Sequence, residues 1–275
     1  MTLVYENFTQ AELDAAYNNR AVERDLGAVK KDRDARSEAV YARLKVTRNL
    51  AYGNKPRQRL DFFHAVAAGR PTVAYIHGGY WQLNDKEPNA FIAEGLLAQG
   101  LNVALLEYTL APAASMTGIV AEIRAALGWL VPRLKSDFHA SDRLVVAGHS
   151  AGGHLTAMSA GVPGVTAVMP ISGLFDLEPI RLSYLNTPLK MDLNEAGANS
   201  PIRLPAPRVP ISVAVGGAEL PELLRQSAEY VSALTAAGVR AGKLIVPGAS
   251  HFSILEQVAR PNGVLAKEAA RLADL

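Results

Sequence analysis

The chain has 275 residues, of which 49% are hydrophobic and 20% charged, and this is the composition of a globular protein rather than a disordered one. Its 28 basic and 26 acidic side chains nearly cancel, so we expect no nucleic-acid partner. Cysteine is absent, which excludes disulfides, thiolate nucleophiles and cysteine-ligated metal centres.

We expect neither a targeting segment nor a membrane segment in this chain. The first 20 residues lack the basic start and apolar core of a signal peptide. Residues 144–175 contain no charged side chain, but glycines and prolines interrupt them too often for a membrane-spanning helix. The sequence therefore favours a cytoplasmic protein that does not enter a membrane.

The N-terminal part of the chain differs in composition from the rest. Between Ala21 and Lys45, charged side chains alternate with apolar ones at helical spacing, which predicts a helix. We interpret its charged side chains as a solvated face. Residues 1–45 are thus expected to form a helical N-terminal extension.

Beyond this extension, short apolar runs alternate with helical patterns. The predicted strands are Leu44–Asn49, Arg57–His64, Thr72–Ile76, Val103–Glu107, Leu144–Ala147, Thr166–Ile171, Ile211–Val215 and Lys243–Val246. The predicted helices are Pro88–Gln99, Met116–Leu134, Ala151–Ala160, Pro221–Ala237 and Val264–Leu275. This alternation predicts an α/β fold with a mostly parallel eight-stranded sheet and helices on both faces. The first two strands have no helix between them and are expected to form an antiparallel edge.

We expect one domain to span residues 1–275. Residues 173–210 do not follow the alternation and contain six prolines. An irregular insertion of this length in a compact domain is often a lid or a binding loop, and the alternative is surface padding.

The most informative motif is the pentapeptide GHSAG at residues 148–152, which lies between a predicted strand and a predicted helix. Glycines two positions before and two positions after Ser150 allow the strand to turn abruptly into the helix, with the serine at the apex. Its hydroxyl would lie at the carboxyl edge of the sheet, beside a helix N-terminus that favours a developing negative charge. We predict that Ser150 is a nucleophile.

A second motif, HGGYW at residues 77–81, directly follows the predicted strand Thr72–Ile76. Paired glycines at a strand end allow backbone N–H groups to approach a substrate oxygen, and this loop supplies half of an oxyanion hole in the predicted order of elements. We predict that the N–H groups of Gly79, Tyr80 and Ala151 form the hole. Trp81 either forms a wall of the substrate pocket or packs in the core.

A nucleophilic serine needs a base whose pKa lies near the working pH, which indicates histidine. Among the six histidines, His251 follows the last predicted strand and precedes the last helix, where the base lies in this order of elements. The other five belong to the two motifs, to the following helix or to no motif: His64, His77, His139, His149 and His154. We predict that His251 is the base.

The acid of the triad is expected after the next-to-last strand, between the serine and the histidine in chain order. Glu219 follows the predicted strand Ile211–Val215 and is our first choice. Glu222 is the second choice, because the dipole of the helix it begins already explains a carboxylate there. Asp176 is a more distant third. The acid would fix the imidazole tautomer and stabilise the imidazolium.

These motifs together resemble a known family. HGGYW at residues 77–81, GHSAGGHL at 148–155, GGAE at 216–219 and HF at 251–252 resemble the kynurenine formamidase (arylformamidase) family of α/β-hydrolases. The run YENFTQAELDAAYNNR at residues 5–20 resembles the helical start of that family. Many members have Asp where this chain has Glu219, and glutamate is compatible with the same role.

The resemblance implies a serine hydrolase that cleaves N-formyl-L-kynurenine to L-kynurenine and formate through an acyl-enzyme, with no metal or cofactor. It is also compatible with a homodimer. The alternative is a carboxylesterase or amidase of small acyl groups with the same triad, and a more remote one is a non-catalytic binding module. Candidates for the charged end of a small-molecule substrate are three cations of the insertion: Arg181, Lys190 and Arg203.

Overall fold

The computed structural model describes residues 2–23 and 25–274. Its centre is an eight-stranded sheet with the strand order β10-β9-β8-β7-β5-β6-β4-β3. The strands are β3 (Val46–Ala51), β4 (Arg59–Phe63), β5 (Thr72–Ile76), β6 (Asn102–Leu106), β7 (Leu144–His149), β8 (Ala167–Ile171), β9 (Ile211–Gly216) and β10 (Ala241–Val246). Strands β3 and β4 run antiparallel at one edge, as expected, and the other six are parallel to one another. The predicted α/β fold is thus confirmed.

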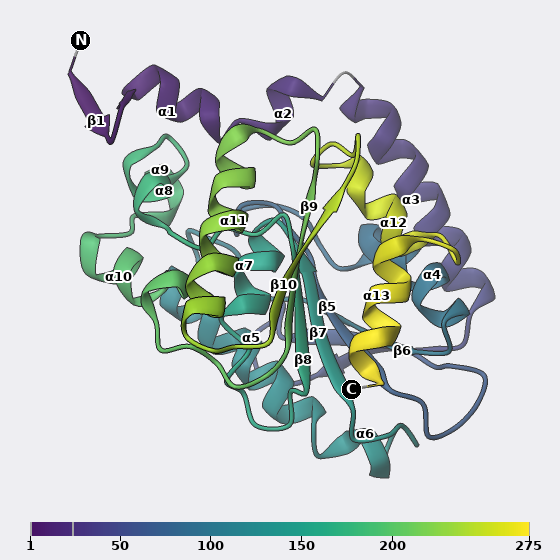
Figure 1. Ribbon diagram of the computed structural model, residues 1–275. Coiled ribbons are helices and arrows are strands. Elements are labelled where there is room, and N and C mark those ends of the chain that lie inside the picture. Colours follow the sequence, from purple (N-terminus) through teal and green to yellow (C-terminus); the bar gives the residue numbers. More distant parts are fainter. Residues whose placement is uncertain (1, 24, 275) are drawn as a thin grey trace.

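Alternating side chains of the parallel strands pack on opposite faces of the sheet, and each face is covered by helices (Figure 1). In β5, Ala74 and Ile76 face one hydrophobic cluster, and Val73 and Tyr75 face the other. The first cluster includes α5 (Met116–Leu130), α7 (Ala151–Ala157) and α11 (Pro221–Ala236). The second includes α3 (Leu26–Arg43), α4 (Ala93–Ala98), α12 (Glu256–Ala259) and α13 (Val264–Ala273).

Two of the helices predicted beyond the N-terminal extension are divided into shorter ones. The segment predicted as Pro88–Gln99 begins as the 3-10 helix η1 (Glu87–Ile92) and continues as α4. The segment predicted as Met116–Leu134 ends as α5 at Leu130 and resumes as α6 (Arg133–Ser136). The helix breaks there because Pro132 has no N–H group to donate the hydrogen bond that a continuous helix requires.

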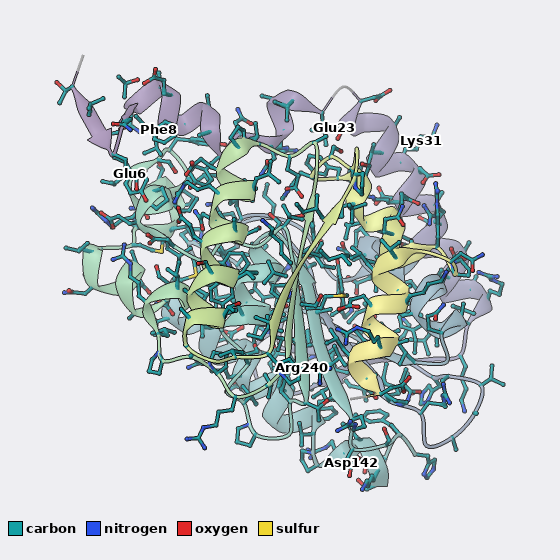
Figure 2. All side chains as sticks on the ribbon, in the orientation of Figure 1. Glu6, Phe8, Glu23, Lys31, Asp142 and Arg240 are labelled. Carbon is teal, nitrogen blue, oxygen red and sulfur yellow. The ribbon has the colours of Figure 1, made fainter. Side chains whose placement is uncertain are left out.

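The N-terminal segment forms a small two-stranded sheet, β1 (Leu3–Tyr5) and β2 (Phe8–Thr9), that the sequence analysis did not predict. Helices α1 (Gln10–Ala16), α2 (Asn19–Val22) and α3 follow it. Asp25 caps α3 by accepting a hydrogen bond from the N–H of Ala28, at 2.8 Å. In Figure 1, α1 and α2 lie along the upper edge of the molecule and α3 descends at the right; Glu23 and Lys31 of this segment are labelled in Figure 2.

Residues 173–210 contain four short helices: α8 (Glu178–Leu182), α9 (Asn186–Leu189), α10 (Leu193–Ala198) and the 3-10 helix η2 (Pro201–Arg203). The first of them, α8, and the residues directly after it pack against α1, since Gln10 donates to the carbonyl of Leu182 at 3.0 Å and Tyr184 donates its N–H to Asp14 at 2.9 Å. Within the described ranges, no helix is both long enough and apolar enough to cross a membrane.

A glycine in α4 sets how closely two helices approach, and its replacement tests this packing. A Cβ atom on Gly95 would lie 2.0 Å from the carbonyl oxygen of Val258 in α12. We expect Gly95→Ala to lower the free energy of unfolding by about 1–3 kcal/mol, because backbone must move to admit the methyl group.

The matched control is Gly128→Ala in α5, where an added Cβ meets no atom within 4 Å. It should raise the free energy of unfolding by roughly 0.5–1 kcal/mol through helix propensity. Equal effects of the two substitutions in urea unfolding would contradict the packing argument.

Candidate active site

Ser150 lies at the sharp turn between β7 and α7 that the pentapeptide predicts. Its backbone has φ 58° and ψ −119°, a strained conformation for a residue with a side chain. A Cβ atom on Gly152 would lie 2.0 Å from the carbonyl oxygen of Ile76, and one on Gly148 would lie 2.7 Å from the same oxygen. The two glycines are therefore required by the close approach of this turn to the end of β5.

Ser150 opens into a cavity of about 220 Å³. The cavity is lined by residues from the motif loops and from the N-terminal helices: Asn19, Arg20, Leu26, Val29, Lys30, Arg33, Asp34, Gly78, Gly79, Tyr80, Leu83, Asn84, Pro88, Asn89, His149, Ser150, His251, Phe252 and Leu255. The structure thus brings Ser150, His251, Gly79 and Tyr80 together around one cavity.

Glu219 holds His251 by a direct hydrogen bond. His251 Nδ1 lies 2.7 Å from Glu219 Oε2. The other carboxylate oxygen accepts the N–H of Gly216 at 2.7 Å and the hydroxyl of Ser172. Because a carboxylate only accepts, Nδ1 must donate, which leaves the lone pair of neutral His251 on Nε2.

The two alternative acids lie elsewhere and have other partners. Glu222 forms an ion pair with Arg225 at 2.7 Å and accepts the hydroxyl of Tyr17 at 2.9 Å. Asp176 forms an ion pair with Arg203 at 3.0 Å. Of the three candidate carboxylates, Glu219 is the one whose hydrogen bond to His251 the structure describes.

The loop after β5 presents backbone N–H groups beside Ser150. Gly79 has φ 119° and Tyr80 has φ 49°, and a Cβ atom on Gly79 would lie 2.3 Å from the carbonyl oxygen of Leu83. Within the part of the chain that the structure describes, neither N–H donates a hydrogen bond. Ala151 is fully buried at the first position of α7, where an N–H has no acceptor inside the helix.

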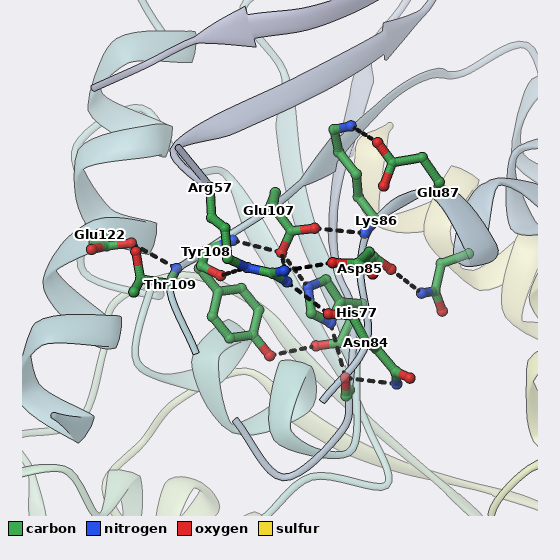
Figure 3. Close-up of polar contacts among 12 residues, drawn as sticks. Arg57, His77, Asn84, Asp85, Lys86, Glu87, Glu107, Tyr108, Thr109 and Glu122 are labelled. Carbon is green, nitrogen blue, oxygen red and sulfur yellow. Dashed lines mark hydrogen bonds and ion pairs between the residues drawn. The ribbon is translucent and has the colours of Figure 1, made fainter. Parts of the chain in front are cut away.

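A buried carboxylate, Glu107, anchors this loop through several hydrogen bonds (Figure 3). Glu107 Oε1 accepts His77 Nε2 at 2.9 Å and Arg57 Nη2 at 2.6 Å, and its Oε2 accepts the N–H of Lys86 at 2.8 Å. Asn84 then donates to the carbonyl of Gly78 at 3.1 Å. Burial works to raise the pKa of Glu107, but its bond to His77 and the charges of His77 and Arg57 together hold this pKa below its usual value.

Trp81 lies in the hydrophobic core, away from the cavity. Of the two interpretations of Trp81, the structure contradicts a wall of the substrate pocket and supports packing in the core. Its side chain is fully buried, and Nε1 donates to His154 Nδ1 at 3.2 Å. An indole N–H needs an acceptor when it is buried, and His154 on α7 supplies one beneath the Ser150 turn.

His149 contacts His251 directly and lines the cavity. Their ring centroids are 4.5 Å apart, and His149 Nε2 lies 2.7 Å from the backbone carbonyl of His251. Burial, followed by the charges of His251 and Arg33, lowers the pKa of His149 well below its usual value. His149 is therefore neutral at neutral pH, donates through Nε2 and helps to hold the backbone of His251 in place.

The charged helix α3 forms one side of the cavity, which the sequence analysis missed when it interpreted this run as a solvated face. The available signal was the spacing of Leu26, Val29, Lys30 and Arg33, which places them on one helix face. The cations proposed from the insertion do not line the cavity. Arg181 and Arg203 form ion pairs with Glu178 and Asp176, and Lys190 is exposed.

No group of side chains in the described ranges has the arrangement of a metal site. The chemistry that this arrangement offers is that of a serine at a strained turn, a histidine held by a carboxylate, and backbone N–H groups beside them.

The chain is similar to known proteins in both sequence and structure. Residues 60–174 match the BD-FAE family model, which spans the HGGYW loop and the Ser150 turn but not Glu219 or His251. Kynurenine formamidase of Danio rerio is 34% identical over 235 residues, which cover 80% of this chain and 79% of the relative. Kynurenine formamidase of Drosophila melanogaster is 28% identical over 231 residues, which cover 77% and 76%.

Among solved structures, a protein of Silicibacter sp. TM1040 that carries the provisional name of thioesterase superposes with a TM-score of 0.86 and 31% identity. The superposition covers 93% of this chain and 98% of that one. An esterase of Pyrobaculum calidifontis superposes with a TM-score of 0.73 at 19% identity, covering 97% of this chain and 98% of that one, which shows a shared fold.

The buried histidine beneath the turn predicts a stability that depends on pH. Burial lowers the pKa of His154 to about 4, from about 6.5 in an unfolded chain. Between these values the unfolded chain binds a proton that the folded chain does not, so stability contributed by neutral His154 is present above pH 6.5 and is lost as the pH falls toward 4. The loss approaches about 3 kcal/mol.

The test compares wild type with His154→Gln by urea unfolding at pH 8 and pH 5. Wild type should lose more stability than the variant between the two pH values, because glutamine does not titrate. A difference between the two proteins that is independent of pH would contradict the prediction.

Proposed function

The chain belongs to the kynurenine formamidase family of α/β-hydrolases, and from that premise we propose that it hydrolyses N-formyl-L-kynurenine to L-kynurenine and formate by a Ser150–His251–Glu219 triad. It is a hydrolase of the arylformamidase and esterase type. The observation that carries the proposal is the cavity shared by Ser150 and His251, with His251 bonded to Glu219 at 2.7 Å.

In the first half of the reaction, Ser150 Oγ attacks the formyl carbon while His251 Nε2 takes the hydroxyl proton. The N–H groups of Gly79, Tyr80 and Ala151 donate to the oxyanion that forms. The carbon–nitrogen bond then breaks, and His251 gives its proton to the departing aniline nitrogen. The products of this half are L-kynurenine and a formyl ester of Ser150.

In the second half, water attacks the formyl ester and His251 takes a proton from that water. Collapse of the second oxyanion breaks the bond to Ser150 Oγ, which recovers its proton from His251, and formate departs. Glu219 stays ionised throughout, holds Nδ1 as the donor and stabilises the imidazolium. The cavity volume supports a small substrate, since about 220 Å³ is below the range of roughly 300–1,000 Å³ typical of ligand pockets.

A second candidate is a hydrolase of small acyl esters with the same triad. The observation that favours it is the 31% identity to the Silicibacter protein, whose name is that of a thioesterase. A comparison of kcat/KM for N-formyl-L-kynurenine, p-nitrophenyl acetate and p-nitrophenyl butyrate distinguishes the two. Efficient turnover of butyryl ester with a silent formamide would favour the second candidate.

The proposed nucleophile is tested by Ser150→Ala. We expect a loss of at least about 10³-fold in kcat, because the covalent route is removed while binding and the oxyanion hole persist. The variant should also fail to react with a fluorophosphonate probe that labels wild type. Retention of more than a few percent of wild-type turnover would exclude this mechanism.

The anchored loop generates a further prediction for Glu107, which we treat as a positioning residue. Glu107→Gln replaces one carboxylate oxygen by an N–H₂ group that cannot accept from His77, Arg57 or Lys86. We expect kcat to fall by about tenfold or more with little change in KM, since removal of a single oxyanion donor costs roughly 10²–10³.

The matched control is Glu122→Gln. Glu122 is also a buried carboxylate, but it accepts the N–H of Thr109 at 2.8 Å and contacts Lys55, outside the loop of residues 77–86. This variant should keep wild-type kcat. Equal falls in kcat for the two variants would show that Glu107 acts only through general stability.

A further inference from the structure

Arg33 on α3 is a cation of the cavity wall that the proposed mechanism leaves unused. Its Nη2 donates to the carbonyl oxygen of Phe252 at 2.5 Å, directly after His251 in the chain. Its guanidinium carbon lies 5.1 Å from the centre of the Phe91 ring. Arg33 is thus held close to the proposed base by one hydrogen bond and one aromatic contact.

The charge of Arg33 is not compensated as the charges of its neighbours are. Lys30 pairs with Asp34 at 2.5 Å, and Arg36 pairs with Glu256 at 3.0 Å. In residues 2–23 and 25–274, no carboxylate forms an ion pair with Arg33. Burial is the largest effect on the pKa of Arg33 and lowers it from its usual value, and the charge of Arg36 lowers it further. Tyr75, Glu256 and Glu23 oppose this shift.

The hydrogen-bond donors of Arg33 are also incompletely used. Nε is enclosed by protein and has no acceptor among the described residues. Nη1 has no acceptor there either, yet it is not among the enclosed atoms, so it remains accessible on a residue that lines the cavity. A half-buried guanidinium whose donors lack acceptors raises the free energy of the folded protein. A carboxylate bound there would match it in charge and in hydrogen-bond geometry.

We propose that Arg33 binds a carboxylate on the leaving group of the substrate, and so makes the enzyme prefer formanilides that carry a carboxylate to those that do not. The inference rests on the proposed function, because it places the reacting formamide at Ser150 and the anionic end of the same molecule at α3. The cavity lined by both residues connects these two ends. Lys30 contributes less, since Asp34 already neutralises it.

The kinetic test uses two substrates that differ in the amino-acid group alone. N-formyl-L-kynurenine carries it, and N-(2-acetylphenyl)formamide has the same aryl formamide and ketone without it. We expect Arg33→Gln to lower kcat/KM for N-formyl-L-kynurenine about 10- to 100-fold more than for N-(2-acetylphenyl)formamide, chiefly through KM. Arg33→Lys should restore part of the preference, because it restores the charge without the fork.

Arg36→Gln is the matched control. Arg36 is on the same helix and its guanidinium carbon also lies 5.1 Å from the centre of the Phe91 ring, but it does not line the cavity. Its substitution should leave the ratio of the two kcat/KM values at the wild-type level. If Arg33→Gln lowered both substrates equally, Arg33 would have a structural role at Phe252 and the proposal would be overturned.

A binding measurement separates this inference from the proposed function. L-kynurenine and 2-aminoacetophenone are titrated into Ser150→Ala and into Ser150→Ala/Arg33→Gln by calorimetry, which needs no turnover. We expect the second substitution to weaken L-kynurenine about 10- to 100-fold more than 2-aminoacetophenone. An unchanged ratio overturns the role of Arg33, whereas absence of formamide hydrolysis by wild type overturns the proposed function alone.

Discussion

The proposed active site depends on the close approach of three backbone segments: the turn around Ser150, the end of β5 and the loop after β5. The turn around Ser150 approaches the carbonyl of Ile76 so closely that a Cβ atom on Gly152 would lie 2.0 Å from it. With glycine there, α7 begins beside the loop that carries Gly79 and Tyr80, and the strained serine points into the cavity that this loop lines. A side chain at that position would separate the turn from the loop, and the proposed nucleophile from the N–H groups proposed to serve it.

Two buried carboxylates hold the loops around this contact, and both oxygens of each accept hydrogen bonds. Glu219 joins β9, the loop after β8 and His251, and Glu107, directly after β6, joins the segment before β4 and the loop after β5. A buried carboxylate is tolerated when several donors compensate for its lost hydration, and it then fixes the geometry of those donors. In the proposed mechanism, Glu219 therefore orients the base and Glu107 orients the oxyanion loop without touching the substrate.

The N-terminal helices turn a widely shared sheet into a particular cavity. Tyr80 donates its hydroxyl to the carbonyl of Tyr17 at 2.6 Å and accepts from Asn19 at 3.1 Å, so the oxyanion loop and the N-terminal segment hold each other. Helix α3 then brings charged side chains to the side of the cavity near His251. The sheet and its loops can serve many hydrolases. In our proposal the preference for a substrate resides in these added helices.

The sequence by itself determined the eight strands, the antiparallel edge and the position of the Ser150 turn, because hydrophobic periodicity and paired glycines are local signals. It also placed His251 and Glu219 at strand ends, which parallel strands bring to one edge of the sheet. Only the tertiary structure shows which of the two carboxylates contacts His251. Glu219, after β9, bonds to His251 in the loop after β10, whereas Glu222 bonds to Tyr17 and Arg225, and our proposal of Glu219 as the acid rests on this difference. The tertiary structure likewise placed Trp81 in the core and α3 against the cavity. The spacing of residues along α3 shows that they share a face, but what that face packs against depends on segments far away in the chain, such as Phe252.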